Sequence, residues 1–272
     1  MFNTELELLV KISPKFEDVK PSDKIWRYMD LTKFLDLILN KTIYLRRIDK
    51  FEDPYEGYIS EAYKANLESQ YRIMQNEHGV DEGESLSLQS AHIYALNVFP
   101  KYAYANCWFL GDVESAAMWK LYGGGHNCVA ISSSIYSLQE VLYEADDDEQ
   151  GVMHLQKIRY VDEASRFTGS NFLNPMFEKR SSFSHEKEFR ALYLLNKGLK
   201  VLNTPSNLHQ PKIEEIDNDD GISLEIDVLK LISAVHISPA ADPHFYSIVE
   251  KTLELAGLDG IECIQSKLYK LK

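Results

Sequence analysis

The sequence is poor in cysteine, and the cysteines that it has form no recognisable pattern. Cys107, Cys128 and Cys263 are the only three among 272 residues, an odd number without C-x-x-C spacing. Disulfide scaffolds and small zinc domains use more cysteines at closer spacing. We therefore expect reduced thiols in a reducing compartment and a fold held together by its hydrophobic core.

Long apolar segments are missing as well. No hydrophobic run approaches the roughly 18 residues that a membrane span requires. The first ten residues, MFNTELELLV, contain no basic region followed by a long apolar stretch, so they do not resemble a signal peptide. These absences predict a cytoplasmic protein that has no membrane partner.

Basic residues are outnumbered. The chain has 29 Lys and Arg against 42 Asp and Glu, which gives a formal net charge of −13. A field of this sign repels phosphodiester backbones and therefore argues against non-specific binding of nucleic acids. A local basic pocket could still bind a small anionic ligand.

The compact motifs of several large enzyme classes are also absent. The sequence has no G-x-x-x-x-G-K-[ST] phosphate loop, no H-E-x-x-H or deaminase-type zinc signature and no G-x-S-x-G turn. The glycines 123–125 are followed by His126, and no lysine is placed to reach a phosphate. G-x-G-x-x-G is missing too, so a dinucleotide, if bound, is not held in the Rossmann manner. We predict no bound metal.

The composition that remains is ordinary for a globular protein, with 44% hydrophobic and 26% charged residues. Because strands and helices are interspersed without a repeat or a clear linker, we predict one α+β domain over residues 1–272, with a mixed central sheet and peripheral helices. Strands are expected at 25–29, 42–46, 102–109, 128–132, 152–160, 188–195, 222–226, 232–238 and 261–264. Helices are expected at 31–40, 58–78, 86–97, 114–122, 133–143, 171–179 and 243–256, and solvated links at 144–149 and 203–220.

The first segment whose residues could bind a ligand or take part in a reaction is the predicted strand around Arg27. An arginine in an otherwise apolar strand needs a partner for its charge, because an unpaired buried guanidinium is costly. Its planar fork suits a diphosphate or a carboxylate, so Arg27 and the adjacent Tyr28 are candidate ligand-binding residues. The alternative is structural: Arg27 lies at a sheet edge or pairs with an internal acid such as Asp53.

The second segment is an aromatic strand followed by a short helix. Trp108 belongs to the strand, and Ser115, Trp119 and Tyr122 follow at positions i, i+4 and i+7 of one helical stripe. Such a stripe usually belongs to a hydrophobic core. Trp108, Trp119 and Tyr122 could also stack on a flat ring such as nicotinamide or adenine.

The third segment carries two glutamates directly before a strand. Glu186 and Glu188 are two residues apart, so we expect their side chains to point to the same side. Paired carboxylates can divide their labour: one stabilises positive charge at a sugar carbon, and the other orients a nucleophile. The alternative is a solvated strand end at which acids and bases neutralise each other.

Three stretches together resemble a widespread bacterial family, the domain-of-unknown-function family numbered 2971. They are IWRYMDLTKFLDLILNKTIYLRRIDKFEDPYEG, ANCWFLGDVESAAMWKLYGGGHNCVAIS and KRSSFSHEKEFRALYL. The shared features are a Y-[KR]-Y-like strand and helix, a D-P-[FY]-E turn, a C-[FW]-x then M-W-x-x-Y block, and a lysine followed by an E-x-E-x-R strand. The resemblance implies a family-like core at about 25–195 and a strand-helix-strand extension at 222–266.

The order of these elements is also similar to that of ADP-ribosyltransferases of the R-S-E type, in which an arginine, a hydroxyl-rich strand and an E-x-E turn follow one another. Arg27 and Glu186–Glu188 match the outer two elements, whereas Cys107 stands where the hydroxyl-rich strand is expected. This resemblance implies a split sheet and NAD as the substrate. It also implies Arg27 and Tyr28 on the cofactor and Glu188 at the sugar.

Our leading hypothesis is therefore an enzyme that transfers ADP-ribose from NAD to a protein or nucleic-acid acceptor, or to water. The resemblance suggests a toxin or phage-defence effector as its biological setting. A second hypothesis is a metal-independent nuclease or other hydrolase that uses His126 or His185 as acid and base. A third is a non-catalytic sensor that binds a nucleotide or a partner protein.

Overall fold

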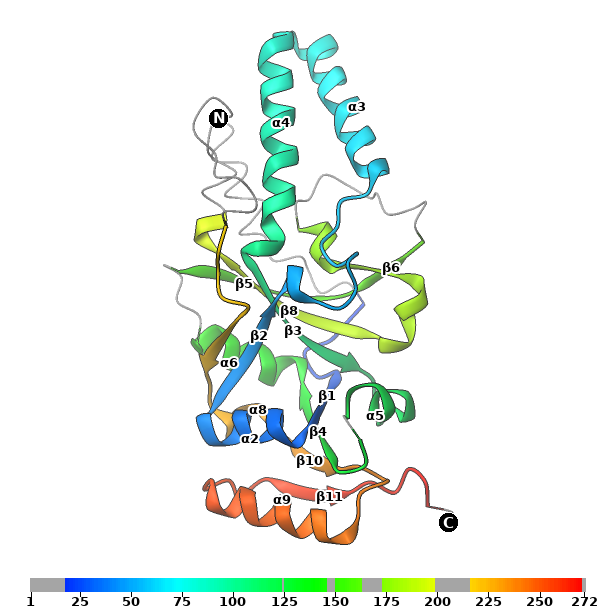
Figure 1. Ribbon diagram of the computed structural model, residues 1–272, viewed down its shortest axis with the longest axis vertical. Coiled ribbons are helices and arrows are strands. Elements are labelled where there is room, and N and C mark those ends of the chain that lie inside the picture. The colour runs from blue at the N-terminus through cyan, green and yellow to red at the C-terminus, as the bar shows by residue number, and fades with distance from the viewer. Residues whose placement is uncertain (1–17, 124, 146–149, 163–172, 199–215, 271–272) are drawn as a thin grey trace.

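The fold is an α+β arrangement built on one mixed sheet that forks at its central strand (Figure 1). The computed structural model describes residues 18–123, 125–145, 150–162, 173–198 and 216–270. The strands of the main sheet are β1 (Lys24–Asp30), β2 (Thr42–Arg47), β3 (Ala103–Leu110), β4 (Cys128–Ser134), β5 (Gly151–Lys157), β8 (Glu188–Leu195), β9 (Gly221–Glu225), β10 (Ala234–Ile237) and β11 (Glu262–Gln265). The predicted fold class is thereby confirmed.

The fork lies along one edge of β3. The other edge of β3 pairs with β8, which in turn pairs with β5. On the forked edge, Phe109 and Leu110 pair with β1, whereas Tyr104 and Ala105 pair with β2. One branch continues from β1 through β4 and β10 to β11, and the other continues from β2 to β9. The C-terminal strands therefore extend both branches of the same sheet.

A buried asparagine connects the strands at the fork. Asn106 is 1% exposed and lies on β3 between the residues that pair with β2 and those that pair with β1. Its Nδ2 donates to the Tyr44 carbonyl oxygen at 2.8 Å, and its Oδ1 accepts from Trp108 Nε1 at 2.6 Å. The amide thus satisfies polar groups that would otherwise lack partners where the strand ladder is interrupted.

Helices cover one face of the sheet. They are α2 (Leu31–Asn40), α6 (Ile135–Ala145), α8 (Val228–Leu231) and α9 (Pro243–Leu255), and all four contribute side chains to the largest hydrophobic cluster. Asp30 caps α2, since its carboxylate accepts from the Lys33 amide at 2.9 Å. α2 ends at Lys41, which adopts the left-handed conformation with φ 54°.

On the opposite face lie the short helix α5 (Ala116–Tyr122) and a small parallel sheet of β6 (Arg159–Val161) and β7 (Glu178–Arg180). In the described ranges, four 3-10 turns connect neighbouring elements: η1 (Ile48–Lys50), η2 (Phe99–Lys101), η4 (Asn174–Phe177) and η5 (Ser181–Glu186). A separate aromatic cluster packs under α5 and includes Trp26, Tyr28 and Trp119.

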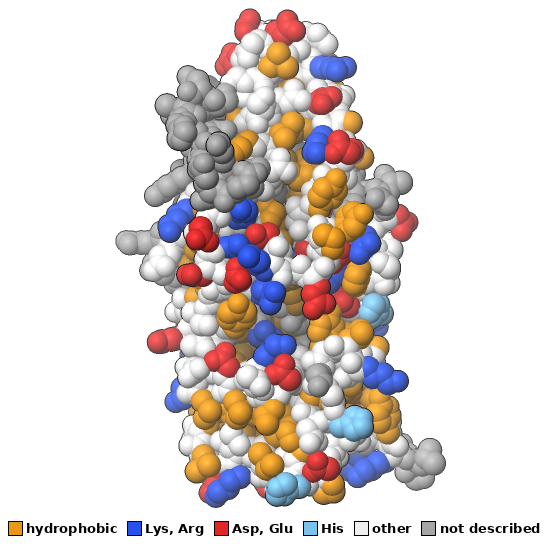
Figure 2. All heavy atoms as spheres, viewed as in Figure 1, with side chains coloured by type: hydrophobic (Ala, Val, Ile, Leu, Met, Phe, Trp, Pro, Cys, Tyr) orange, Lys and Arg blue, Asp and Glu red, His pale blue; other side chains and the backbone are white. Residues whose placement is uncertain are grey.

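Two long helices, α3 (Glu61–His78) and α4 (Glu82–Val98), form an arm that projects from the body of the molecule (Figure 1). Within the described ranges, neither these nor any other helix is long and apolar enough to cross a membrane. The surface carries both signs of charge, and Lys and Arg side chains gather across the middle of the face shown in Figure 2, with acidic side chains among them.

Two predicted elements were wrong. The helix expected at 171–179 is instead the turn η4 followed by β7, with residues 171 and 172 outside the described part. Pro175 lies in this turn, and the chain then becomes extended to pair with β6. The strand expected at 152–160 breaks at Ile158, whose amide bonds to the Glu188 carbonyl oxygen, so β5 and β6 join different sheets. Most of the predicted links at 144–149 and 203–220 lies outside the described residues.

Replacing Asn106 with alanine should lower the free energy of unfolding by about 2–4 kcal/mol, because the Trp108 indole N–H and the Tyr44 carbonyl would both lose their partner. Urea denaturation measures the change. Asn97→Ala is the matched control: this asparagine is exposed and bonds only within α4, so its loss should cost less than about 0.5 kcal/mol. Equal effects of the two substitutions would contradict the role assigned to Asn106.

Candidate functional site

A buried ionic network lies beside β3 and β8 and is centred on Lys179. Its ammonium nitrogen is 2.5 Å from Glu186 Oε2, 3.1 Å from Glu56 Oε1 and 3.4 Å from Glu188 Oε2. All four residues are at most 7% exposed. Lys179 comes from β7, the two later glutamates flank the start of β8, and Glu56 comes from the D-P-Y-E turn. One cation therefore joins three carboxylates from two distant parts of the chain.

Local backbone geometry brings the two neighbouring glutamates together. Glu186 ends η5, Glu188 begins β8, and Lys187 between them adopts the left-handed conformation with φ 40°. We expected the side chains of Glu186 and Glu188 to point the same way because side chains alternate along a strand. The carboxylates do meet at Lys179, but they do so across this turn rather than along a continuous strand.

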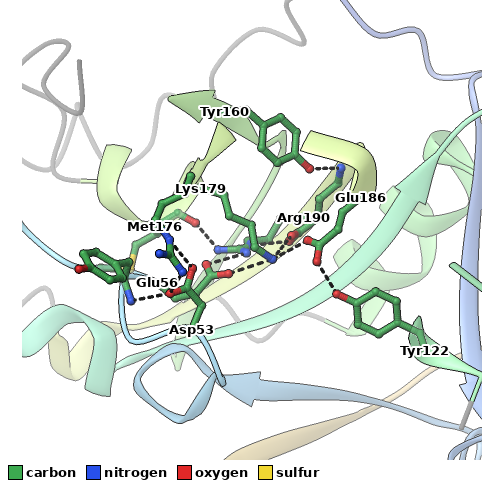
Figure 3. A network of polar contacts seen from close by, with 11 residues as sticks. Asp53, Glu56, Tyr122, Tyr160, Met176, Lys179, Glu186 and Arg190 are labelled. Carbon is green, nitrogen blue, oxygen red and sulfur yellow. Dashed lines mark hydrogen bonds and ion pairs between the residues drawn. The ribbon is translucent and has the colours of Figure 1, made fainter. Parts of the chain in front are cut away.

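Arg190 forms the second cationic centre (Figure 3). Its guanidinium is fully buried and donates to Glu188 Oε1 at 2.6 Å, to Glu56 Oε2 at 2.9 Å and to the Met176 carbonyl oxygen at 2.7 Å. These bonds use all three nitrogens of the side chain. A buried guanidinium with this set of partners is held in one orientation, and it fixes both carboxylates in turn.

The D-P-Y-E turn contributes a further pair at the edge of the network. Asp53 bonds to Arg180 at 3.0 Å, and the Arg180 guanidinium lies 4.5 Å from the Tyr55 ring centroid. The suggestion that Asp53 pairs with Arg27 was therefore wrong. The chain places Arg180, which adjoins Lys179 on β7, within reach of the turn instead.

The charges of the network shift the proton affinities of its members. Burial alone would raise the pKa of Glu188, but the nearby Arg190 and Lys179 outweigh burial and lower the pKa to about 2. Burial alone would likewise lower the pKa of Lys179, whereas the surrounding glutamates raise it above its ordinary value. At neutral pH the network therefore holds Glu188 as a carboxylate and Lys179 as an ammonium ion.

Tyr122 connects this network to the surface. Its hydroxyl donates to Glu186 Oε1 at 2.5 Å, whereas its side chain is 43% exposed. Tyr122 is the last residue of α5, and Gly123 directly after it packs tightly against β4. A Cβ atom at position 123 would come within 2.5 Å of both Cys128 Sγ and the Trp119 carbonyl oxygen. The glycine thus allows the end of α5 to lie close to the sheet.

The first and second sequence segments meet in the aromatic cluster. The Tyr28 ring packs edge-to-face on Trp119 with centroids 5.0 Å apart, and its hydroxyl accepts from the Ser115 amide at 2.7 Å. Trp119 Nε1 donates to Glu114 at 2.8 Å. Tyr28 and Trp119 are both buried, so they support α5 from below, while Tyr122 occupies its exposed end.

Arg27 lies at the fork of the sheet, directly after Trp26, the last residue of β1 that pairs with β3. No described residue forms an ion pair or hydrogen bond with its partly exposed side chain. Burial lowers the pKa of Arg27 to about 10, so it stays charged at neutral pH. The Cys107 thiol lies within electrostatic reach of Arg27 and Tyr122 and donates a hydrogen bond to Glu188. Burial raises the pKa of this partly exposed thiol.

Trp108 is not brought to this site. Side chains alternate along β3, so Trp108 points away from Cys107 and Phe109 and packs in the large cluster on the helix-covered face. Of the seven predicted site residues, Tyr28, Trp119, Tyr122, Glu186 and Glu188 lie on the network's side of the sheet. Arg27 alternates with Trp26 and Tyr28 along β1, so its position belongs to the face of Ile25 and Met29, and its electrostatic interaction with Cys107 is what links it to the site.

Sequence reasoning missed four members of the site. Glu56, Lys179 and Arg190 supply most of its buried bonds, and the Cys107 thiol interacts with Glu188. The three charged residues stand within the quoted D-P-Y-E and K…E-x-E-x-R motifs. Between them the two motifs contain charged residues of opposite sign, and this was the signal that could have indicated a contact between Glu56 and the two cations.

The candidate histidines lie elsewhere. His126 and His185 are exposed, and no contact among the described residues orients either imidazole. A hollow of about 480 Å³ between α9 and β11 contains none of the predicted site residues. In the part of the chain that the structure describes, no group of His, Cys, Asp and Glu side chains has an arrangement that could hold a metal ion.

Comparison with known proteins gives no match: no family model, no curated protein and no solved structure is significantly similar to the chain. The resemblances to the family numbered 2971 and to ADP-ribosyltransferases therefore stay predictions from the sequence motifs.

The stability of the wild-type chain should fall as the pH drops below about 4.3. The Glu188 pKa is lower in the folded chain than the ordinary glutamate value of about 4.3, so the unfolded chain binds the proton more readily. The contribution of Glu188 is thus complete above that pH and is lost as the pH falls toward about 2. Urea denaturation between pH 7 and pH 3 measures it. A Glu188→Gln protein should lack this part of the acid dependence.

Lys179→Met should cost about 3–5 kcal/mol of unfolding free energy at pH 7, because three buried carboxylates would lose their shared cation. Lys230→Met is the control, since Lys230 pairs with Glu144 at 2.7 Å on the exposed surface and should contribute less than about 1 kcal/mol. A Lys179 variant as stable as the control would refute the central role of this ammonium group.

Proposed function

We propose that the chain is an NAD-consuming enzyme that breaks the bond between nicotinamide and ribose. Nicotinamide leaves with the bonding electrons, and the C1′ carbon is attacked by a group on a macromolecule or by water, which loses a proton. The products are free nicotinamide and an ADP-ribosylated acceptor, or free ADP-ribose.

The observation that carries this proposal is the fixed carboxylate of Glu188 beside an exposed aromatic ring. Arg190 and Lys179 hold Glu188 at 2.6 and 3.4 Å, and Tyr122 joins the same network through its bond to Glu186 at 2.5 Å. Arg27 stands at the fork of the sheet, close enough to Cys107 for an electrostatic interaction. A guanidinium without a partner among the described residues, an exposed aromatic ring and a fixed carboxylate are the groups needed for a diphosphate, a flat ring and a developing cation.

Each residue has a defined role in the proposal. Arg27 binds the diphosphate, and Tyr122 contacts the nicotinamide ring. Trp119 supports α5, the helix that carries Tyr122. Glu188 stabilises the oxocarbenium-like transition state, since Arg190 and Lys179 hold it ionised and in place before the ligand arrives. Each carboxylate oxygen can accept more than one hydrogen bond, so these ion pairs leave acceptor capacity for a ribose hydroxyl. Glu186 orients the acceptor.

A nucleotide-binding sensor is the second candidate function. Glu186 and Glu188 already bond to cations of the chain itself, and this arrangement also suits a purely structural role. Saturable NAD binding in calorimetry, without any release of nicotinamide, would favour the sensor. A histidine-dependent hydrolase is less well supported, because nothing described positions His126 or His185 for proton transfer.

Incubation of the full chain with NAD should release nicotinamide, which chromatography detects. Glu188→Gln should slow the release by at least about 100-fold through loss of transition-state stabilisation. Arg27→Gln should weaken NAD binding about tenfold or more, with little change in thermal stability, because Arg27 has no partner among the described residues.

Arg46→Gln is the control for Arg27, since Arg46 is an exposed arginine of β2 whose one hydrogen bond among the described residues goes to the Lys50 carbonyl oxygen. Thermal melting of every variant separates loss of chemistry from loss of folding. A folded Glu188→Gln protein with full NAD turnover would remove this proposal.

A further inference from the structure

The hydroxyl of Tyr122 has a fixed hydrogen-bond polarity. A phenol has one proton to donate and two lone pairs that accept. The proton goes to Glu186 Oε1 at 2.5 Å. The other oxygen of this carboxylate accepts from Lys179 at 2.5 Å, and a carboxylate that accepts on both oxygens has no proton to return. Only lone pairs of the Tyr122 oxygen therefore remain for another molecule.

This polarity is stable at neutral pH. Burial and the hydrogen bond to Glu186 both raise the pKa of Tyr122 above its ordinary value, so the phenol keeps its proton. Glu186 is 5% exposed and cannot turn toward solvent without breaking its bond to Lys179. The donor of Tyr122 is thus permanently occupied.

Tyr122 is also the member of the network that an incoming molecule meets. Its side chain is 43% exposed, whereas Glu186 is 5% and Glu188 is 3% exposed. Figure 3 shows its ring extending away from the buried ion pairs on the side opposite Asp53 and Glu56. A ligand that approaches Glu188 from this edge contacts a hydrogen-bond acceptor.

The carboxylate behind Tyr122 favours the same kind of ligand. Glu186 accepts the phenolic proton, so a ligand group at the Tyr122 oxygen lies close to this negative charge. A carboxylate placed against Tyr122 would face the unshared lone pairs of the phenol, with the Glu186 carboxylate directly behind them. A neutral amide or hydroxyl group would find an acceptor for its proton.

We propose that Tyr122 selects its ligand by polarity, accepting a hydrogen bond from a neutral N–H or O–H group and rejecting a carboxylate. This inference rests on the proposed function, and within it the selected group is the carboxamide of nicotinamide. The chain should therefore distinguish NAD from nicotinic acid adenine dinucleotide, in which a carboxylate replaces that carboxamide and nothing else changes.

Calorimetry of the full chain with each dinucleotide tests the inference. NAD should bind at least about tenfold more tightly than the nicotinic acid form. Tyr122→Phe should lower the ratio of the two affinities, because the ring remains and the phenolic acceptor is lost, while the Glu186 carboxylate behind it stays. Tyr143→Phe is the matched control, a tyrosine with 42% exposure on α6, and it should leave the ratio unchanged.

Glu186→Gln gives a sharper test. The carbonyl oxygen of the introduced amide would accept from Lys179, so the NH₂ group of that amide would donate to the Tyr122 oxygen and release the phenolic proton toward the ligand. Tyr122 would become a donor, and the preference should move toward the carboxylate form. Thermal melts confirm that each variant is folded.

The outcomes separate the two proposals. If the wild-type chain binds neither dinucleotide, the proposed function fails and the inference fails with it. If it binds both equally, or the nicotinic acid form more tightly, the polarity inference alone is overturned. An unchanged ratio in folded Tyr122→Phe and Glu186→Gln proteins would overturn it as well.

Discussion

The architecture of the candidate site depends on one ammonium group. Lys179 is the point at which the D-P-Y-E turn, the end of η5 and the start of β8 meet, and its three carboxylate partners repel one another without it. Removing charges from water is costly, so the arrangement persists only because every charge has close partners of opposite sign. Arg190 adds a second cation to two of the same carboxylates. The acids are thereby held in fixed positions before any ligand binds.

Local patterns in the sequence were sufficient to predict most of the strands and helices. The strand at 188–195 was predicted at its observed bounds, because aromatic and aliphatic residues alternate there with a clear start at Glu188. Lys179 was assigned to a helix, since nothing nearby showed that its stretch pairs with β6. The pairing of strands distant in sequence is decided by tertiary contacts and is not visible in a short window.

The sequence predicted Tyr122, Glu186 and Glu188 as site residues but missed the two cations, Lys179 and Arg190, that hold the site together. Glu186 and Glu188 were found because two acids precede a strand, yet the third acid of the network was missed: Glu56 lies 134 positions from Arg190, to which it bonds. Trp108 was assigned to the ligand by composition, although strand alternation turns it to the helix-covered face. Which side of a sheet a residue occupies depends on the register, and the aromatic strand gave no polar alternation from which to read it.

The glycine after Tyr122 has a consequence for how this protein tolerates change. Position 123 has no room for a methyl group, since Cys128 and the backbone of Trp119 fill the space. A substitution there, far from any charge, would push α5 away from the sheet and draw the phenol off its acid. The position of Tyr122 therefore depends on Gly123, a residue without a side chain. A survey of catalytic side chains would overlook it.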